Sequence, residues 1–338
     1  MAGKILRGAV VGASSLLGKE LAEELSKATA FVWDLTLLDT EEAGGQMTAA
    51  GEEAMVIQTI SAEAFSGIDV AFFAGDAATA LAFWKSAHVA GASIVDLTGA
   101  LEGQPQVLVR AASMTGGPAA NLATVALVPA HPVAVMLGML QARLESFGLT
   151  RMIATVLRPA SECGSAGVEE LHQQTVGLLA FKPLKKDVYD TQVAFNVVSS
   201  LGEAAKVSLE TVSATIHRQL GMLLGVEVAE RMVLQLIEAP VFHGYTASVF
   251  LEFGPGVDAE TLRAALHGEG LEVAAEPSPS NESAAGKDEI VLSVSAAASK
   301  DGSCFWVWMA ADNLRIAARN AAGCAVELAA LRPADGVH

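Results

Sequence analysis

The chain has 338 residues, of which 52% are hydrophobic and 17% charged, so it is long enough for about two domains with a substantial core. Its formal net charge of −17 disfavours nucleic acid and anionic membranes as partners, because both carry negative charge themselves. The stretch 111–141 has no charged residue, but prolines interrupt it, and the first residues lack the long apolar run of a signal peptide, so we expect a cytoplasmic protein without a membrane span.

The first predicted element is a short apolar strand, Gly8–Val11, followed by a turn rich in glycine and serine and a helix from about Gly18. Such a helix presents free N–H groups and a positive dipole end to a phosphate above the turn. Gly12 suits the tight turn and Gly18 permits close packing, whereas Ser15 places a Cβ where a pyrophosphate approaches the backbone. A plain turn without a ligand remains an alternative. The candidate phosphate-binding residues are Gly12, Ser14, Ser15, Leu16, Leu17 and Gly18.

The second predicted strand, Trp33–Leu38, ends at Asp39 and Thr40. An acidic residue at this place can accept hydrogen bonds from an adenosine ribose. Glu41 and Glu42 follow, and the three carboxylates would repel a 2′-phosphate, so the loop favours NAD over NADP. The alternative is a solvated acidic loop.

Apolar strands and helices alternate through the first 130 residues. Continuous apolar strands in this arrangement indicate a parallel sheet with helices on both faces. The further strands predicted here are Ile68–Phe73, Ala92–Leu97 and Thr124–Val128, with a helix at Ala77–Ala90.

A buried helix, Val133–Phe147, follows Pro132, which suits the first helical position and leaves His131 as the cap. Beyond this point strands and helices mix less regularly, which predicts an α+β domain. The strands expected there are Arg151–Leu157, Met232–Glu238, Ser248–Phe253, Ile290–Val294 and Phe305–Met309. The helices expected there begin at Val168, Ser208 and Asp258, and Pro277–Asp288 is predicted to be an exposed loop. A last helix, Leu314–Leu331, closes the chain.

His131 and Cys163 are the candidates for chemistry in this half. The helix dipole favours a neutral imidazole at His131, which can then act as a base or a hydrogen-bond donor, or serve only as a polar cap. Cys163 lies in a loop and forms either a displaced Cys–His pair with His131 or an inert buried thiol. The three cysteines are widely spaced and no ligand spacing is present, so we expect neither disulfides nor a metal site.

The order of motifs along nearly the whole chain resembles the aspartate-semialdehyde dehydrogenase family, and is most similar to its Usg-type paralogues. The segments that carry the resemblance are GASSLLG (12–18), FFAGDAATA (72–80), DLTGAL (96–101), AFN (194–196), APVFHG (239–244), PSPSNESAAGKDE (277–289) and WVWMAADNLRIAARNA (306–321). The resemblance implies a Rossmann-like domain that binds NAD or NADP and an inserted catalytic and dimerisation domain. It adds Ala74, Gly75 and Asn313 to the candidate cofactor-binding residues.

Enzymes of this family attack an aldehyde with a cysteine thiolate, pass hydride to NADP and release the acyl group to phosphate. A thiolate at a helix N-terminus is stabilised by the helix dipole. In this chain His131 occupies the cysteine position, and two arginine positions carry glutamates, which cannot clamp an anion. The positions of the family's glutamine, substrate arginine, general-base histidine and phosphate arginine correspond to Arg158 (or Leu157), Glu238, Tyr245 and Glu102.

We therefore expect an α/β Rossmann-like domain at 1–131 and 314–338, with an inserted α+β domain at 132–313 that forms a homodimer through its sheet. The first hypothesis for function is a protein with a dinucleotide-binding scaffold that has lost the phosphorylating semialdehyde dehydrogenase reaction. The alternative is an active NAD(P)-dependent oxidoreductase on a different aldehyde or oxo substrate, with His131, Cys163 or Tyr245 as catalytic residues. The inherited reaction is disfavoured by the histidine at position 131.

Overall fold

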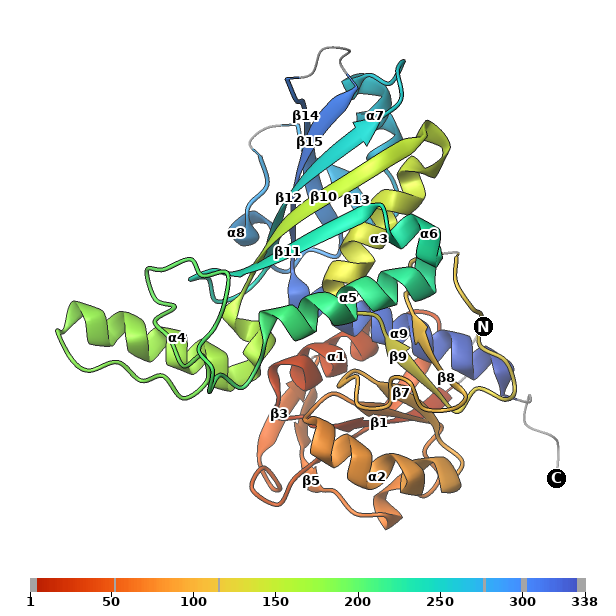
Figure 1. Ribbon diagram of the computed structural model, residues 1–338. Helices are drawn as coiled ribbons and strands as arrows, with labels where there is room; N and C mark the ends of the chain where they lie inside the picture. The colour runs from red at the N-terminus through yellow and green to blue at the C-terminus, as the bar shows by residue number, and fades with distance from the viewer. Residues whose placement is uncertain (1–4, 52, 115, 276–277, 299–302, 333–338) are drawn as a thin grey trace. The chain divides into compact units, whose positions relative to one another are not determined.

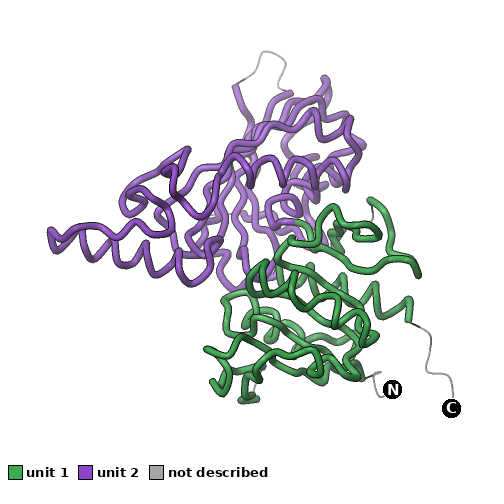
Figure 2. Tube along the Cα trace, turned by 60° about the horizontal axis from the view of Figure 1, so that its bottom comes forward, with its two compact units in different colours: residues 1–130, 317–338 green, residues 131–316 purple. Residues whose placement is uncertain are grey.

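The computed structural model describes residues 5–51, 53–114, 116–275, 278–298 and 303–332. The chain folds into two compact units, residues 1–130 with 317–338, and residues 131–316 (Figure 2). Among the described residues, no helix is both long and apolar enough to cross a membrane.

The first unit is built on a parallel seven-stranded sheet in the order β5-β2-β1-β6-β7-β9-β8. Apart from the exposed β5, the strands are mostly apolar, as expected for a sheet that is covered on both faces. Their bounds are β1 Ile5–Val11, β2 Val32–Asp39, β5 Gln58–Thr59, β6 Val70–Phe73, β7 Ser93–Asp96, β8 Val107–Arg110 and β9 Ala126–Pro129.

Helices cover both faces of this sheet (Figure 1). The helix α1, Leu16–Lys27, shares one apolar core with the part of α9, Asn313–Leu331, that lies in the first unit. The helix α2, Ala77–Val89, packs on β6 and β7 from the other face. A hairpin of β3, Met47–Ala50, and β4, Glu53–Val56, lies beside α1. The predicted parallel α/β architecture of this unit is confirmed.

The second unit contains a mixed six-stranded sheet in the order β11-β10-β12-β15-β14-β13. Its strands are β10 Leu149–Arg158, β11 Met232–Glu238, β12 Tyr245–Phe253, β13 Leu271–Val273, β14 Ile290–Ala296 and β15 Cys304–Ala311. The helices α3, α5 and α7 pack together and against β10, β11 and β14. The helices of this unit are α3 Pro132–Leu144, α4 Gly164–Leu179, α5 Leu209–Leu224, α6 Val226–Ala229, α7 Ala259–Leu266 and α8 Asn281–Ala284. The expected α+β mixture is therefore present.

Several element boundaries differ from the sequence predictions, and each difference has a local cause. The prediction missed β8 and the β3–β4 hairpin, because strands of four residues at or beyond a sheet edge carry too short a pattern. The helix α4 begins four residues before Val168, since GSAG at 164–167 has low helix propensity and hides its start. The predicted loop at 277–288 contains α8, which a capping box at Ser280 starts; Pro277 lies outside the described residues.

Candidate functional site

The strand–turn–helix of the first unit is held together by two glycines. Gly12 has a φ of 82°, and a Cβ there would lie 2.3 Å from the Cα of Gly75. A Cβ on Gly18 would lie 2.2 Å from the carbonyl oxygen of Gly12, so the expected close packing is present. The helix α1 begins at Leu16 rather than near Gly18. The turn therefore fixes the helix N-terminus directly above the ends of β1 and β6.

Ser15 is the N-cap of α1. Its hydroxyl accepts a hydrogen bond from the Gly18 N–H at 2.8 Å and donates one to the Ala74 carbonyl oxygen at 2.9 Å. Its φ of −67° is an ordinary conformation for serine, and its side chain is committed to the protein. The first N–H groups of a helix have no partner within the helix, and this leaves those of Leu16 and Leu17 for a ligand. The turn therefore fits a phosphate at these two N–H groups. The sequence placed the Cβ of Ser15 near the pyrophosphate, and the structure shows that the Ser15 side chain is instead used to cap α1.

Asp39 lies at the end of β2, where the sequence places it, and is 8% exposed. One carboxylate oxygen accepts a hydrogen bond from the Ser14 N–H and the other accepts one from the Thr40 N–H, both at 2.8 Å. Asp39 thus ties the end of β2 to the glycine turn. A carboxylate oxygen has more than one acceptor site, so these bonds leave room for a ribose hydroxyl.

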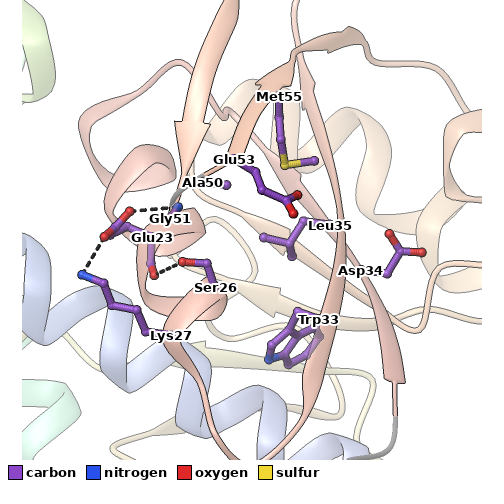
Figure 3. A pocket seen from close by; sticks show the side chains of 10 residues that line it. All are labelled: Glu23, Ser26, Lys27, Trp33, Asp34, Leu35, Ala50, Gly51, Glu53 and Met55. Atoms are coloured by element: carbon purple, nitrogen blue, oxygen red, sulfur yellow. Dashed lines mark hydrogen bonds and ion pairs between the residues drawn. The ribbon is translucent and has the colours of Figure 1, made fainter.

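A separate hollow of about 680 Å³ lies at the other end of α1, between that helix, the start of β2 and the β3–β4 hairpin (Figure 3). Glu23 there pairs with Lys27 at 2.6 Å and accepts a hydrogen bond from the Gly51 N–H at 2.9 Å. Trp33, Asp34 and other residues line the rest of this hollow. This hollow does not include the glycine turn. We place the candidate dinucleotide site at the turn, where the first N–H groups of α1 are available to a phosphate.

In the second unit, His131 caps α3 and Pro132 takes the first helical position, as predicted. The His131 Nδ1 accepts a hydrogen bond from the Val133 N–H at 3.2 Å, and the His131 N–H donates to the Gln219 side-chain oxygen at 2.7 Å. The cap bond therefore fixes the imidazole, and the Gln219 bond fixes the backbone of His131 against the helix α5.

The second imidazole nitrogen of His131 faces Glu162. The distance from Nε2 to the carboxylate is 3.5 Å, and the other oxygen of Glu162 accepts a hydrogen bond from Asn313 at 2.9 Å. Burial raises the pKa of Glu162, but hydrogen bonding and charge from His131, with Arg158 and Asn313, outweigh it and lower this pKa to about 2. Both ring nitrogens of His131 therefore have partners, which supports its role as a polar helix cap rather than as a general base. Sequence reasoning missed Glu162, although it directly precedes Cys163.

Asn313 lies in the second unit with this cluster. It is 1% exposed, and its side-chain oxygen accepts a hydrogen bond from the Gly244 N–H at 3.0 Å. Its amide nitrogen donates to Glu162 and to the Ser161 hydroxyl. The expectation that Asn313 binds the cofactor is therefore not matched by its contacts, which orient Glu162 instead.

Arg158 and Glu238 form a buried ion pair at 2.8 Å, with exposed fractions of 2% and 1%. They are the last residues of the parallel strands β10 and β11 and lie opposite one another. Burial raises the pKa of Glu238 to about 7, and the guanidinium of Arg158 only partly offsets this effect. Glu238 is therefore not an isolated negative charge, because Arg158 compensates it.

Cys163 contacts Arg158 and does not form the displaced pair with His131. Its Sγ accepts hydrogen bonds from both terminal nitrogens of Arg158 at 3.5 Å, whereas His131 pairs with Glu162. Burial raises the pKa of the Cys163 thiol, and Arg158 counteracts this only in part. These contacts favour the inert thiol over the Cys163–His131 pair.

Tyr245 begins β12 and is fully buried, with its ring centroid 6.1 Å from that of His131. Burial raises the pKa of its hydroxyl, and Glu162 raises it further. Among the described residues, no hydrogen-bond partner of good geometry reaches this hydroxyl. The structure therefore brings together His131 and Tyr245 around Glu162. In the described part of the chain, no group of His, Cys, Asp and Glu side chains is arranged to hold a metal ion.

Comparison with known proteins covers both units. Residues 7–128 match the model of the semialdehyde dehydrogenase NAD binding domain, and residues 140–316 match that of the semialdehyde dehydrogenase dimerisation domain. A protein named USG-1 protein homolog from Pseudomonas aeruginosa is 30% identical over 318 residues, which is 92% of this chain and 93% of that protein.

Enzymes named for the parent reaction are also similar. Aspartate-semialdehyde dehydrogenase of Bacillus subtilis is 25% identical over 342 residues, covering 92% of this chain and 94% of the enzyme. The solved structure of a probable aspartate-semialdehyde dehydrogenase from Pseudomonas aeruginosa superimposes with a TM-score of 0.82 at 29% identity, covering 95% of this chain and 97% of that one. The expected resemblance is confirmed. The chain belongs to the semialdehyde dehydrogenase family, with an NAD binding domain followed by a dimerisation domain.

Proposed function

We propose that this chain binds a dinucleotide and lacks the phosphorylating semialdehyde dehydrogenase reaction. The observation that carries the proposal is that His131 caps α3, at the position to which the resemblance assigns the family's thiolate, and has both ring nitrogens engaged. An imidazole held in this way cannot form the thioester that phosphate would release. Cys163 does not substitute for it, because its thiol is held by Arg158 and its pKa is raised by burial. The expected phenotype is dinucleotide binding without NADP reduction by aspartate semialdehyde and phosphate.

The turn from Gly12 to Gly18 supports dinucleotide binding, and Asp39 supports NAD over NADP. The Leu16 and Leu17 N–H groups suit a phosphate, while Asp39 and the glutamates after it would repel a 2′-phosphate.

We expect NAD at 100 times its Kd to raise the free energy of unfolding by about 2.7 kcal/mol, and NADP to have a smaller effect at the same concentration. Thermal unfolding followed in parallel titrations measures both. Asp39→Asn should narrow the difference between the two dinucleotides. Asp34→Asn, an exposed change on the same strand, should leave that difference as it is. Folded protein that responds to neither dinucleotide would contradict the proposal.

A second candidate function rests on the buried Tyr245 hydroxyl, which has no good partner among the described residues. A protonated phenol in this place can donate a proton to the oxygen of a carbonyl that receives hydride. This arrangement favours an NAD(P)-dependent oxidoreductase on a different aldehyde or oxo substrate. Both candidate functions predict dinucleotide binding, so the titration does not separate them. Reduction of a carbonyl substrate by the wild-type protein that is lost in Tyr245→Phe would support the second candidate.

We propose that the second unit forms a homodimer through its sheet. Val233, Ile153, Phe250 and Trp306 are aligned across β11, β10, β12 and β15 by the strand register, so they share one face. Val233, Ile153 and Trp306 remain 55%, 37% and 46% exposed. An apolar row of this kind is typical of a protein interface.

Val233→Glu should raise the dimer dissociation constant at least about 100-fold, which corresponds to about 2.8 kcal/mol, because each copy would bury an unpaired carboxylate. Sedimentation velocity across a concentration series measures this change. The matched control is Val89→Glu, on the exposed surface of α2, which should leave the dimer intact. Equal behaviour of the two variants would place the interface elsewhere.

A further inference from the structure

We propose that Glu238, Arg158 and Tyr245 bind the carboxamide group of an uncharged ligand and discriminate against a carboxylate. The inference rests on the proposed function, because it takes the site that has lost its nucleophile as a binding site. It is carried by the alignment of the three side chains, their unpartnered atoms and their charge balance.

The strand register places the three residues in one row at the same edge of the sheet. Arg158 lies opposite Glu238 in the parallel pair of β10 and β11. Leu157 lies opposite Thr246 in the antiparallel pair of β10 and β12, so Tyr245 continues the row beside Arg158. None of the three residues is more than 2% exposed. The row is therefore a buried polar strip across three neighbouring strands.

Each member of the row keeps one polar atom unpartnered. Among the described residues, no hydrogen bond of good geometry reaches the Arg158 Nε, the Glu238 Oε1 or the Tyr245 hydroxyl, and Glu162 is the acidic group that lies near this hydroxyl. Buried polar groups are nearly always paired, and three unpaired groups on adjacent residues point to a missing partner. The set contains one obligate donor, one acceptor and one hydroxyl. A carboxamide matches it, because its oxygen accepts from Arg158 and Tyr245 while its nitrogen donates to Glu238.

The charge of the row disfavours an anion. The guanidinium of Arg158 is already neutralised by Glu238 at 2.8 Å and also donates to Cys163. The carboxylate of Glu162 lies nearby and contributes negative charge to the same site. A ligand carboxylate would face two glutamates with no uncompensated cation, whereas a neutral amide meets no such repulsion. The side chains of His131 and Glu162 are 17% and 15% exposed, so this side of the cluster is partly in contact with solvent.

The test compares butyramide with butyrate, two probes of nearly equal shape that differ in charge. Binding to the full-length protein is measured by ligand-observed NMR at pH 8, above the pKa of Glu238 of about 7. We expect butyramide to bind at least about 10-fold more tightly than butyrate. Equal binding, a preference for butyrate, or no binding of butyramide would each overturn the proposal; in the last case water is left as the partner of the three atoms.

Variants test the individual contacts. Glu238→Gln leaves Arg158 without its counter-ion and should reverse the preference toward butyrate. Tyr245→Phe removes one donor and should weaken butyramide binding about 10-fold, whereas Tyr189→Phe, at the only other tyrosine of the chain, should leave it unchanged. If Glu238→Gln does not fold, the wild-type preference and the two tyrosine variants still decide the matter. These binding experiments contain neither dinucleotide nor aldehyde. Their outcome therefore does not depend on whether the protein turns over a semialdehyde.

Discussion

Replacing Arg158 with methionine should lower the free energy of unfolding by about 3–5 kcal/mol. The change leaves Glu238, which is 1% exposed, without its counter-ion and its closest hydrogen-bond donor. Urea unfolding at pH 8 measures the loss.

The pH dependence of the loss has a definite sign. Without Arg158 the pKa of Glu238 should rise beyond about 7, while it stays near 4.5 in the unfolded chain. The folded variant then holds a proton that the unfolded chain lacks, so its stability falls as pH rises above about 4.5. The difference from wild type should therefore be smaller at pH 5 than at pH 8.

Two control variants separate this pair from ordinary ion pairs. Arg110→Met breaks an arginine–glutamate pair with the same 2.8 Å separation, but the side chains of Arg110 and Glu327 are 12% and 23% exposed. It should cost about 1 kcal/mol. The double variant Arg158→Met with Glu238→Leu removes both charges and should regain most of the stability. An Arg158→Met variant no less stable than Arg110→Met would refute the buried pair.

Glu162→Gln should remove a component of acid sensitivity worth roughly 3 kcal/mol. The pKa of Glu162 is about 2 in the folded chain against an ordinary value of 4.5, because the pairing with His131 and Asn313 outweighs burial. A carboxylate with a lowered pKa stabilises the fold above pH 4.5, and this contribution is lost as pH falls toward 2.

Urea unfolding between pH 2.5 and 7 measures the difference in stability between Glu162→Gln and wild type, which should stay constant down to about pH 4.5 and shrink below it. Glu169→Gln, at an exposed position on α4, is the matched control and should follow the wild-type profile. A constant difference across the pH range would show that Glu162 is not held ionised by its neighbours.

The sequence predicted the parts of the molecule that depend on local pattern. The β1–turn–α1 unit, the end of β2 at Asp39 and the cap at His131 all follow from residues close together in the chain. Glycine and proline determine backbone geometry locally, so such features are readable without a fold.

The pairing within the candidate site was not predictable in the same way. Arg158 and Glu238 are 80 residues apart, and they meet only because β10 and β11 pair in one particular parallel register. From sequence alone Glu238 was a reversed charge, and Arg158 was a substituted glutamine position. Their mutual neutralisation appears only when the sheet is assembled.

The roles of Cys163 and Asn313 show a second limit. A pair of Cys163 with His131 was one of two alternatives that the sequence left open, but Glu162, one position earlier, is the residue that contacts His131. Asn313 was assigned to the cofactor through a family motif, and its amide is instead used by Glu162, Ser161 and Gly244. A loop's direction and an amide's partners depend on side-chain geometry that a motif does not encode.

We propose above that the chain keeps the dinucleotide scaffold and has lost the parent reaction. The most direct measurement is NADP and NAD reduction by purified protein with aspartate semialdehyde and phosphate, after binding of the dinucleotide has been verified by titration. We expect no turnover above the rate without protein, because His131 cannot form a thioester. Turnover at an ordinary enzymatic rate, on the order of 1–1000 per second, would contradict the account.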